Sequence, residues 1–490
     1  MPVVPRTPVL IGAGQVNQHD GDLDPVGLMA AAARRACDAR VLESVDSIRV
    51  VNLLSWRYRD PGLLLGRQIG ATNFSTSYSG VGGNVPHALM NRAYLDIQQG
   101  RADVVLIAGG ECWRTKTRLR ADQKKPQWPQ QDDSVPMAEG DGDDVPMAGP
   151  AELRIELIQP AHVYPMFEQA LRIAAGESSD EHRRRIGELW SQFSVVAAGN
   201  PNAWSPRAVP AEDIWQPGPD NRMISWPYTK LMNSNNMVDQ GAVVVLASAQ
   251  AAERLHVSSD RWVFPYAGTE SHDTYTLGER LDFHRSAAIR IAGRRVLELA
   301  GGLGVDDIEF VDLYSCFPSA VQVAANELGL PIGDSGRPLT VTGGMPFAGG
   351  PWNNYVTHSV GTMAGLLLAN PGSFGLVTAN GGYLTKHSIG VYGTEPPSAE
   401  FRWEDVQSAV DQEPTRTAYD QWEGIGTIES WTAPFDRDGR PQKAFVSVRT
   451  PEDARTLAVL TAQGDVQASV DDDIAGVQVA VHGDGTAALV

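Results

Sequence analysis

The chain has 490 residues, of which 42% are hydrophobic and 20% charged, the composition of a globular protein long enough for roughly two to four structural units. Its 40 basic and 59 acidic residues give a net charge of −19, which argues against nucleic acid or an anionic membrane surface as a partner. The 3 cysteines have no paired spacing, so a disulfide framework and a zinc site are not expected.

The first 115 residues alternate short apolar runs with helical patterns. A strand beginning at Pro8 precedes an Ala-rich helix, for which Asp24 is the predicted N-cap and Pro25 the first helical residue. After a second strand-like run and a short helix, the pattern predicts a helix from about Val85 to Gln99. The next run, ADVVLIAGGE, is typical of a strand covered on both sides of a parallel sheet. This order predicts an α/β fold.

Residues 116–228 interrupt this rhythm and are predicted to form a loop-domain insertion. The segment is rich in Pro, Gln, Asp and Gly, and then contains two helical stretches. Its acidic part, MAEGDGDDVPMAG, lacks the oxygen spacing and the closing Glu of a calcium-binding loop. We therefore expect a solvated loop there. Nowhere in the chain do His, Cys or carboxylates have ligand spacing on one element, so no metal site is expected.

The strand and helix pattern resumes at DQGAVVVLAS and repeats after residue 260, which suggests two similar halves. From about Asp411 the sequence changes to short β-prone runs with a DRDG turn, which predicts a small separate β domain. The expected units are an N-terminal half formed by residues 1–115 and 229–255, the insertion at 116–228, a C-terminal half at 256–400, and an additional β domain at 411–490.

Four stretches carry a resemblance to a known family: GVGGNVPHALMNRAYLDIQQGRADVVLIAGGE, VDLYSCFPSA, GGMPFAGGP and TANGGYLTKHSIGVYG. In this order and spacing they are similar to the nucleophile helix and the catalytic turns of the thiolase superfamily. The likeness is strongest to its sterol-carrier-protein-type and type 1 thiolase-like branch, and it covers roughly residues 7–395. The resemblance implies duplicated βαβαβαββ halves in a five-layered core. It also implies CoA or an acyl-CoA as substrate or ligand, without a further cofactor.

The reactive positions of the family are changed in this chain. The resemblance aligns Gly83 with the nucleophilic cysteine, Gly350 with the histidine that takes the thiol proton, and Asn380 with the second cysteine. A covalent acyl intermediate requires a thiolate at a helix N-terminus, and glycine has no side chain to supply it. We therefore expect no ping-pong Claisen chemistry.

The polar groups that remain at these turns form the candidate site. Backbone N–H groups at the start of the helix and at the glycine turns are expected to bind a thioester oxygen or another anion. The candidates for this oxyanion and ligand binding are Gly83, Asn84, Gly350 and Gly382. The candidates for catalysis are Tyr314, His358 and Asn380.

The catalytic candidates also have structural interpretations. Tyr314 stands where the family's HDCF segment has its histidine, so its phenol is expected to donate a hydrogen bond, to accept a proton if its pKa is lowered, or to pack at a strand end. His358 or His387 is expected to supply a general base or a structural hydrogen bond. Cys316 is expected to be an inert buried thiol, and Tyr383 a packing residue.

Three functions stay open at this stage. The first is binding of an acyl-CoA or a related thioester without standard thiolase activity. The second is a retro-aldol carbon–carbon lyase that acts on a β-hydroxyacyl-CoA through Tyr314, together with Tyr383 or His358. The third is a non-catalytic scaffold or partner protein, with an OB-like C-terminal domain as its contact surface. The resemblance also implies a homodimer, and the sequence predicts a cytoplasmic protein because no apolar run is long enough to span a bilayer.

Overall fold

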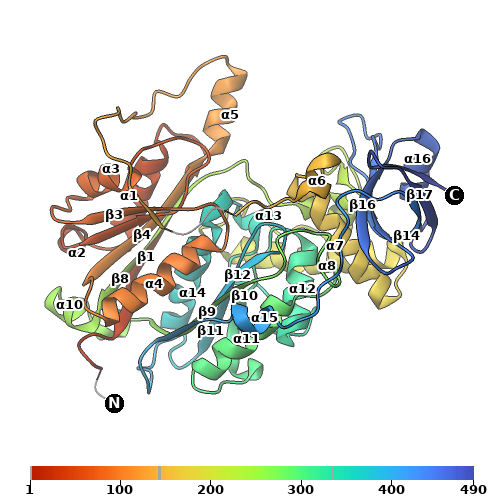
Figure 1. Ribbon diagram of the computed structural model, residues 1–490. Helices are drawn as coiled ribbons and strands as arrows, with labels where there is room; N and C mark the ends of the chain where they lie inside the picture. Colours follow the sequence, from red (N-terminus) through yellow and green to blue (C-terminus); the bar gives the residue numbers. More distant parts are fainter. Residues whose placement is uncertain (1–2, 142–144, 334–335) are drawn as a thin grey trace.

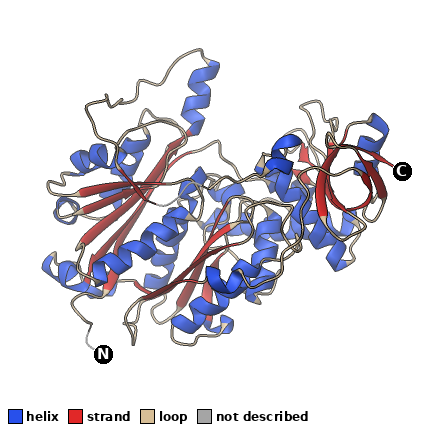
Figure 2. Ribbon diagram, in the orientation of Figure 1, coloured by secondary structure: helices blue, strands red, loops and turns tan. Residues whose placement is uncertain are grey.

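The computed structural model describes residues 3–141, 145–333 and 336–490. Two mixed β-sheets enclose a central layer of helices, further helices cover the outer faces, and a small barrel stands at one end (Figure 1, Figure 2). The predicted α/β fold with a five-layered core, an insertion and a C-terminal β domain is confirmed.

The first sheet has the strand order β1-β8-β4-β2-β3-β5. β8 lies antiparallel between β1 and β4, whereas β4, β2, β3 and β5 run parallel to one another. Its strands are β1 (Pro8–Asn17), β2 (Ser47–Val50), β3 (Ser75–Ser79), β4 (Val104–Cys112), β5 (Glu139–Asp141) and β8 (Asp239–Ser248).

The predicted strand in ADVVLIAGGE is β4, and it is buried on both faces. Val104 and Leu106 pack in the outer core beneath α1 (Pro25–Ala36), α2 (Ala39–Glu43) and α3 (Pro61–Ile69). Val105 and Ile107 point the other way, into the core between the two sheets. Successive residues of β4 thus point into two different hydrophobic cores, and this explains why the run is apolar without interruption.

Two helices form the central layer of the core. α4 (Val85–Gln98), predicted from its sequence pattern, contacts strands of both sheets, as does α14 (Tyr355–Ala369). Pro86 lies in the first turn of α4. A backbone N–H in this turn has no acceptor within the helix, so proline costs no hydrogen bond there. The N-terminus of α4 is therefore held between the sheets.

The second sheet has the order β10-β11-β12-β9-β13. α11 (Ala287–Leu299) covers its outer face, and α12 (Pro318–Leu328) packs beside α11. β11 and β12 are antiparallel neighbours, while β10 runs parallel to β11. The strands are β9 (Phe264–His272), β10 (Ile308–Asp312), β11 (Phe374–Gly381), β12 (Lys386–Gly393) and β13 (Arg402–Asp405).

The inserted segment contains the helices expected there and one strand of the first sheet. Its elements are α5 (Trp113–Ala121), α6 (Pro150–Arg154), α7 (Pro160–Ala175), α8 (Ser179–Gly199), α9 (Ala211–Trp215), β6 (Met223–Ser225) and β7 (Tyr228–Thr229). α5 extends away from the sheet (Figure 1). Part of the acidic segment forms β5, which pairs with the edge strand β3. The rest of the predicted loop includes residues 142–144, which lie outside the described residues.

The C-terminal domain is a closed barrel in the order β14-β15-β16-β18-β17. Trp431, fully buried, is the largest side chain of its separate hydrophobic core. The elements are β14 (Gly424–Thr432), β15 (Ala444–Arg449), β16 (Arg455–Leu460), α16 (Gln463–Asp471), β17 (Gln478–Val481) and β18 (Thr486–Leu489). Five strands with a helix before the fourth fit the OB-like topology that the sequence predicts.

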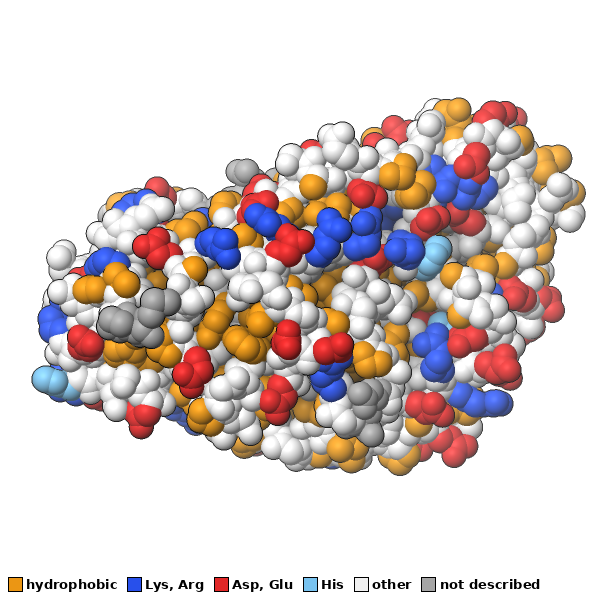
Figure 3. Space-filling model, turned by 90° about the horizontal axis from the view of Figure 1, so that it is seen from below, with side chains coloured by type: hydrophobic (Ala, Val, Ile, Leu, Met, Phe, Trp, Pro, Cys, Tyr) orange, Lys and Arg blue, Asp and Glu red, His pale blue; other side chains and the backbone are white. Residues whose placement is uncertain are grey.

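Short elements complete the chain: α10 (Ala249–Arg254), α13 (Met345–Ala348), α15 (Gln407–Val410), and the 3₁₀ turns η1 (Lys230–Met232), η2 (Ser259–Arg261), η3 (Val305–Asp307) and η4 (Trp352–Asn354). Within the three described ranges, none of the helices is both long and apolar enough to cross a membrane. The net charge of −19 is not spread evenly, because basic side chains form a row among acidic ones on the lower face (Figure 3). The overall charge therefore does not by itself repel an anionic ligand from every face.

Candidate functional site

The start of α4 faces the end of β11. Asn84 precedes α4, and its Oδ1 packs against Gly381 at the end of β11. A Cβ atom on Gly381 would lie only 2.3 Å from this oxygen. A Cβ atom on Gly83 would lie 2.0 Å from Tyr314 Oη and 2.5 Å from Asn380 O. The hydroxyl of Tyr314 therefore occupies the point where a nucleophilic side chain at position 83 would begin. These contacts bring four of the predicted residues to one place.

Strand pairing explains why these residues meet. β10 and β11 run parallel and end at the same edge of the sheet, where Tyr314 N donates a 2.9 Å hydrogen bond to Thr378 Oγ1. In the antiparallel pair β11–β12, Asn380 lies directly opposite His387. Opposed residues of such a pair present their side chains on one face of the sheet. His387, one of the two histidines predicted as a base, thus joins Asn380.

A cavity of about 10 Å³ lies between these side chains. This volume is close to what a single water molecule requires. The lining is Tyr314, Thr378, Asn380, His387, Ile289, Ala320, Ala324, Ala379, Leu384 and Ile389. The site is closed in this conformation, so a thioester can enter only if a covering side chain moves.

Tyr164, on the inserted helix α7, is such a cover. Its hydroxyl donates to Gly382 O at 3.0 Å and accepts hydrogen bonds from Asn380 Nδ2 and Leu384 N, both at 2.9 Å. Gly382 has a φ of +73°, a conformation that favours glycine, at the turn after β11. The sequence prediction missed Tyr164, because no local pattern connects residues this far apart in the chain.

Burial keeps the hydroxyl and thiol groups of the site protonated. It raises the pKa of Tyr314 well above its ordinary value, and the nearby Cys316 thiol adds to the effect. Burial likewise raises the pKa of Cys316 to about 12. The sequence left open a lowered Tyr314 pKa; the opposite shift keeps the phenol neutral, so that it can donate a hydrogen bond or a proton but is not a base. Cys316 lacks the thiolate character of a nucleophile.

Two amide oxygens at the site, Asn84 Oδ1 and Asn380 Oδ1, have no hydrogen-bond partner among the residues that the structure describes. Asn380 is only 4% exposed. A buried acceptor left unpaired costs about 1–3 kcal/mol. These two atoms are therefore positions where a bound donor, such as a hydroxyl group or water, gains a hydrogen bond. A cation lies close by, since Lys386 Nζ donates to Val81 O at 2.9 Å just before α4.

Leu384 marks backbone strain next to the cavity. Its φ is +56°, in the left-handed region that non-glycine residues seldom adopt. The conformation is held by its N–H bond to Tyr164 and by its carbonyl, which accepts from Arg280 Nη1 at 2.8 Å and lies 3.3 Å from His387 Nε2. Strain of this kind, over-determined by its surroundings, is concentrated at functional sites.

The cavity lining does not include Gly83, Asn84 or Gly382, and three further predicted residues make their contacts elsewhere. A Cβ atom on Gly350 would lie 2.1 Å from Ser234 Oγ, so this turn packs against the segment before β8. His358 donates from Nδ1 to Gln15 Oε1 at 3.0 Å, and burial lowers its pKa to about 3. Tyr383 donates its hydroxyl to Ile158 O at 2.5 Å, as expected for a packing residue. Their predicted roles in ligand binding and catalysis stay predictions.

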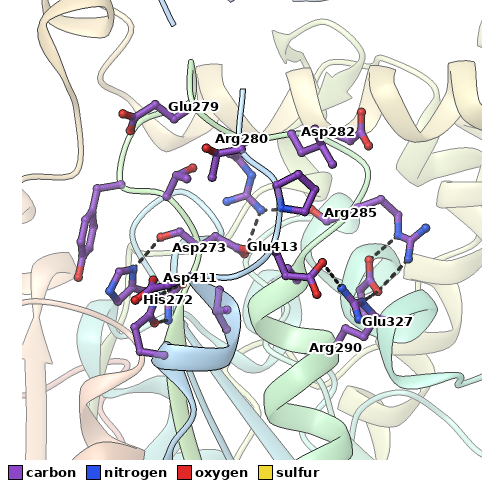
Figure 4. Close-up of a pocket in the computed structure, with 18 residues that line it drawn as sticks. His272, Asp273, Glu279, Arg280, Asp282, Arg285, Arg290, Glu327, Asp411 and Glu413 are labelled. Atoms are coloured by element: carbon purple, nitrogen blue, oxygen red, sulfur yellow. Dashed lines mark hydrogen bonds and ion pairs between the residues drawn. The ribbon is translucent and has the colours of Figure 1, made fainter. Parts of the chain in front are cut away.

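A larger cavity of about 500 Å³ lies on the other side of His387, where β9 ends and α11 begins (Figure 4). Carboxylates and arginines from four segments face one another across it, and most of them are paired. The labelled lining residues are His272, Asp273, Glu279, Arg280, Asp282, Arg285, Arg290, Glu327, Asp411 and Glu413. In the described part of the chain no cluster of His, Cys, Asp or Glu is suited to a metal ion.

Replacing Gly83 by alanine tests the packing at the site. The new Cβ would clash with a backbone carbonyl and a buried hydroxyl, so we expect a local destabilisation of about 1–3 kcal/mol, measured by hydrogen exchange of α4. Gly365 in α14 is a matched control, because nothing lies within 4 Å of a Cβ there, and Gly365→Ala should stabilise by about 0.5–1 kcal/mol. Equal stability of Gly83→Ala and the wild type would contradict the close approach of Tyr314.

Comparison with known proteins gives the family. Residues 405–486 match the family model described as the thiolase-like protein type 1 additional C-terminal domain. The whole chain superposes with a TM-score of 0.84 on a monomeric SCP2-thiolase like protein type 1 from Mycobacterium smegmatis, at 29% identity over 100% of both chains. No match was found among curated protein sequences.

More distant structures share the fold of the core. An acetyl-CoA acetyltransferase from Syntrophomonas wolfei matches with a TM-score of 0.57 and 15% identity, over 79% of this chain and 99% of its own. A structure described as an Ltp2-ChsH2(DUF35) aldolase matches with a TM-score of 0.58 and 19% identity, over 80% of this chain and 98% of its own. The core of this chain therefore has the thiolase fold.

The C-terminal barrel and the full-length match make the chain similar to the type 1 thiolase-like proteins of the thiolase superfamily. The Mycobacterium smegmatis protein is described as monomeric, and in the present chain β5 occupies the edge of β3. The homodimer stays a prediction.

Proposed function

We propose that this protein binds an acyl thioester, such as an acyl-CoA, at the N-terminus of α4 without capturing it covalently. The observation that carries the proposal is the position of the Tyr314 hydroxyl, 2.0 Å from where a Cβ on Gly83 would lie. The Tyr314 hydroxyl, a hydrogen-bond donor, thus lies where the nucleophilic side chain of the family would begin. The N-terminus of α4 beside it favours a partial negative charge. A thioester carbonyl oxygen needs a donor of this kind.

Binding requires the cavity to open, since about 10 Å³ holds no more than a water molecule. Leu384 lines the cavity, and its N–H is bound by Tyr164 of the inserted helix α7, so we expect the opening motion at these two residues. The unpaired oxygen of Asn380 would then accept a hydrogen bond from the ligand. Gain of that bond offsets part of the cost of opening.

Calorimetric titration with acetyl-CoA tests the proposal. We expect saturable binding, and weaker binding of free CoA, because the acyl carbonyl makes the contacts at Tyr314. Mass spectrometry of the intact protein after incubation should show no acyl adduct on Cys37, Cys112 or Cys316. Absence of binding up to millimolar ligand, or an adduct that forms and decays during turnover, would contradict non-covalent thioester binding.

A second candidate function is a retro-aldol carbon–carbon lyase acting on a β-hydroxyacyl thioester. Tyr314, protonated and beside Asn380, is a proton donor to the enolate that such cleavage produces. One of the proteins with the same fold is described as an aldolase. Incubation with a β-hydroxyacyl-CoA should release a carbonyl compound and a shorter acyl-CoA in equal amounts by liquid chromatography and mass spectrometry. Unchanged substrate would rule out this candidate for the acyl chain tested.

A further inference from the structure

A buried histidine and a buried carboxylate connect the two cavities. His387 lines the 10 Å³ cavity together with Tyr314 and Asn380, and its Nε2 lies 3.4 Å from Asp273 Oδ2. Asp273 in turn lines the 500 Å³ cavity (Figure 4). The sequence prediction named His387 but did not detect Asp273, which follows β9 more than 100 residues earlier in the chain.

Hydrogen bonding determines which ring nitrogen of His387 carries the proton. Nε2 has two near neighbours, Leu384 O at 3.3 Å and the Asp273 carboxylate, and both are acceptors. A hydrogen-bonded Nε2 must therefore carry a proton. In the neutral form of the ring Nδ1 then carries the lone pair, which is the arrangement of a base held by a carboxylate.

Asp273 is held as a carboxylate. Burial alone would raise its pKa, but the Arg280 guanidinium, His387 and Ser286 Oγ lower it to about 2. Ser286 Oγ donates to Oδ2 at 2.5 Å, Arg280 Nη2 donates to the same oxygen at 3.1 Å, and Ala288 N donates to Oδ1. The carboxylate also lies at the N-terminus of α11, where the helix dipole favours a negative charge. Figure 4 shows Arg280 and Asp273 pointing toward each other.

We propose that His387 is the general base of this site and that Asp273 is the residue that positions it. The inference rests on the lyase candidate described above. The water-sized cavity, which His387 lines, is where the β-hydroxyl group of the substrate lies and donates its hydrogen to Nδ1.

The reaction balances without a co-reactant. His387 Nδ1 takes the proton of the β-hydroxyl, the new C=O bond forms as the Cα–Cβ bond breaks, and the electron pair moves onto the thioester as an enolate. Tyr314 then protonates Cα. The phenolate regains a proton from the His387 imidazolium, so that the enzyme returns to its starting state with a carbonyl compound and a shorter acyl thioester as products.

Nitrogen NMR of the histidine rings tests the dyad independently of activity. We expect the neutral His387 ring to carry its proton on Nε2 and not on Nδ1. Asp273→Asn should shift the His387 tautomer population and lower kcat about tenfold or more at unchanged KM, whereas a purely structural role would leave the tautomer as it is. A wild-type ring protonated at Nδ1 would overturn the proposal.

Turnover of the His387→Gln variant separates this inference from the proposed function. We expect kcat to fall about 10²-fold or more, with thioester affinity within threefold of wild type. His284→Gln, in the loop before α11, is the matched control and should keep wild-type rates. Wild-type rates in His387→Gln would show that His387 is not the general base, and they would leave the proposed lyase activity intact. Absence of cleavage by the wild-type protein would overturn both.

Discussion

Replacing Tyr314 by phenylalanine is expected to slow carbon–carbon cleavage of a β-hydroxyacyl thioester by about 10²- to 10⁴-fold. The substitution removes only the hydroxyl, the group beside Gly83 that burial keeps protonated. The ring keeps its edge-to-face packing on Tyr355, with centroids 5.6 Å apart, so the fold should be preserved. The enolate then lacks its proton donor, and kcat should fall while KM changes little.

Tyr383→Phe is the matched control for this experiment. Tyr383 is also a buried tyrosine near the β11–β12 turn, and burial raises its pKa to about 12, but its hydroxyl donates to Ile158 O, away from the cavity. We expect its loss to reduce stability by about 1 kcal/mol and to leave kcat unchanged. Equal turnover of Tyr314→Phe and wild type would show that the phenol is not the donor, whatever the result for Tyr383.

The sequence predicted the fold well where local patterns carry the information. Asp24 accepts a hydrogen bond from Gly27 N as the N-cap of α1, and α4 begins at Val85, both as predicted. The strand β5 was not predicted, because its three residues, Glu139 to Asp141, have the composition of a loop. It forms through parallel pairing with β3, which tertiary contacts determine and propensity does not.

The candidate site was predicted only in part, for the same reason. The family motifs located Tyr314, Asn380 and the glycines, since each of these residues lies in a recognisable stretch of sequence. Tyr164 and Asp273 reach the site from distant segments, and a single sequence contains no signal that pairs them with Asn380 and His387. The shift of the Tyr314 pKa also depends on burial, which the sequence pattern at a strand end does not determine.

The C-terminal barrel holds the loop that supports this site. Arg455 on β16, 1% exposed, inserts its guanidinium into the loop between β9 and α11, where it donates to Leu277 O and Gly278 O at 3.2 Å and also to Arg280 O. It forms an ion pair with Glu429 of β14 and lies over the Phe283 ring, 4.3 Å from its centroid. The Arg280 side chain extends from the same loop to Asp273. The added domain therefore stabilises the segment that positions the His387–Asp273 pair.

Arg455→Ala is expected to destabilise the barrel and its contact with the core by about 3–5 kcal/mol, because it removes the buried cation of Glu429 and leaves only the more exposed Arg449 as its partner. Hydrogen exchange of β14–β16 is the suitable measurement, since a multidomain chain does not unfold in two states. Protection should fall by about 10²-fold or more. Arg449→Ala, which removes a more exposed partner of the same carboxylate, should cost less than about 1 kcal/mol.

The pH dependence of this difference checks the cause. Burial would raise the pKa of Glu429, but Arg455 overrides that effect and lowers it. A lowered folded-state pKa contributes stability that is complete above the unfolded value of about 4.3 and is lost as the pH falls through the folded value. The gap between wild type and Arg455→Ala should therefore be largest near pH 7 and shrink below about pH 4. A gap independent of pH would show that packing on Phe283, and not the ion pair, holds the barrel to the core.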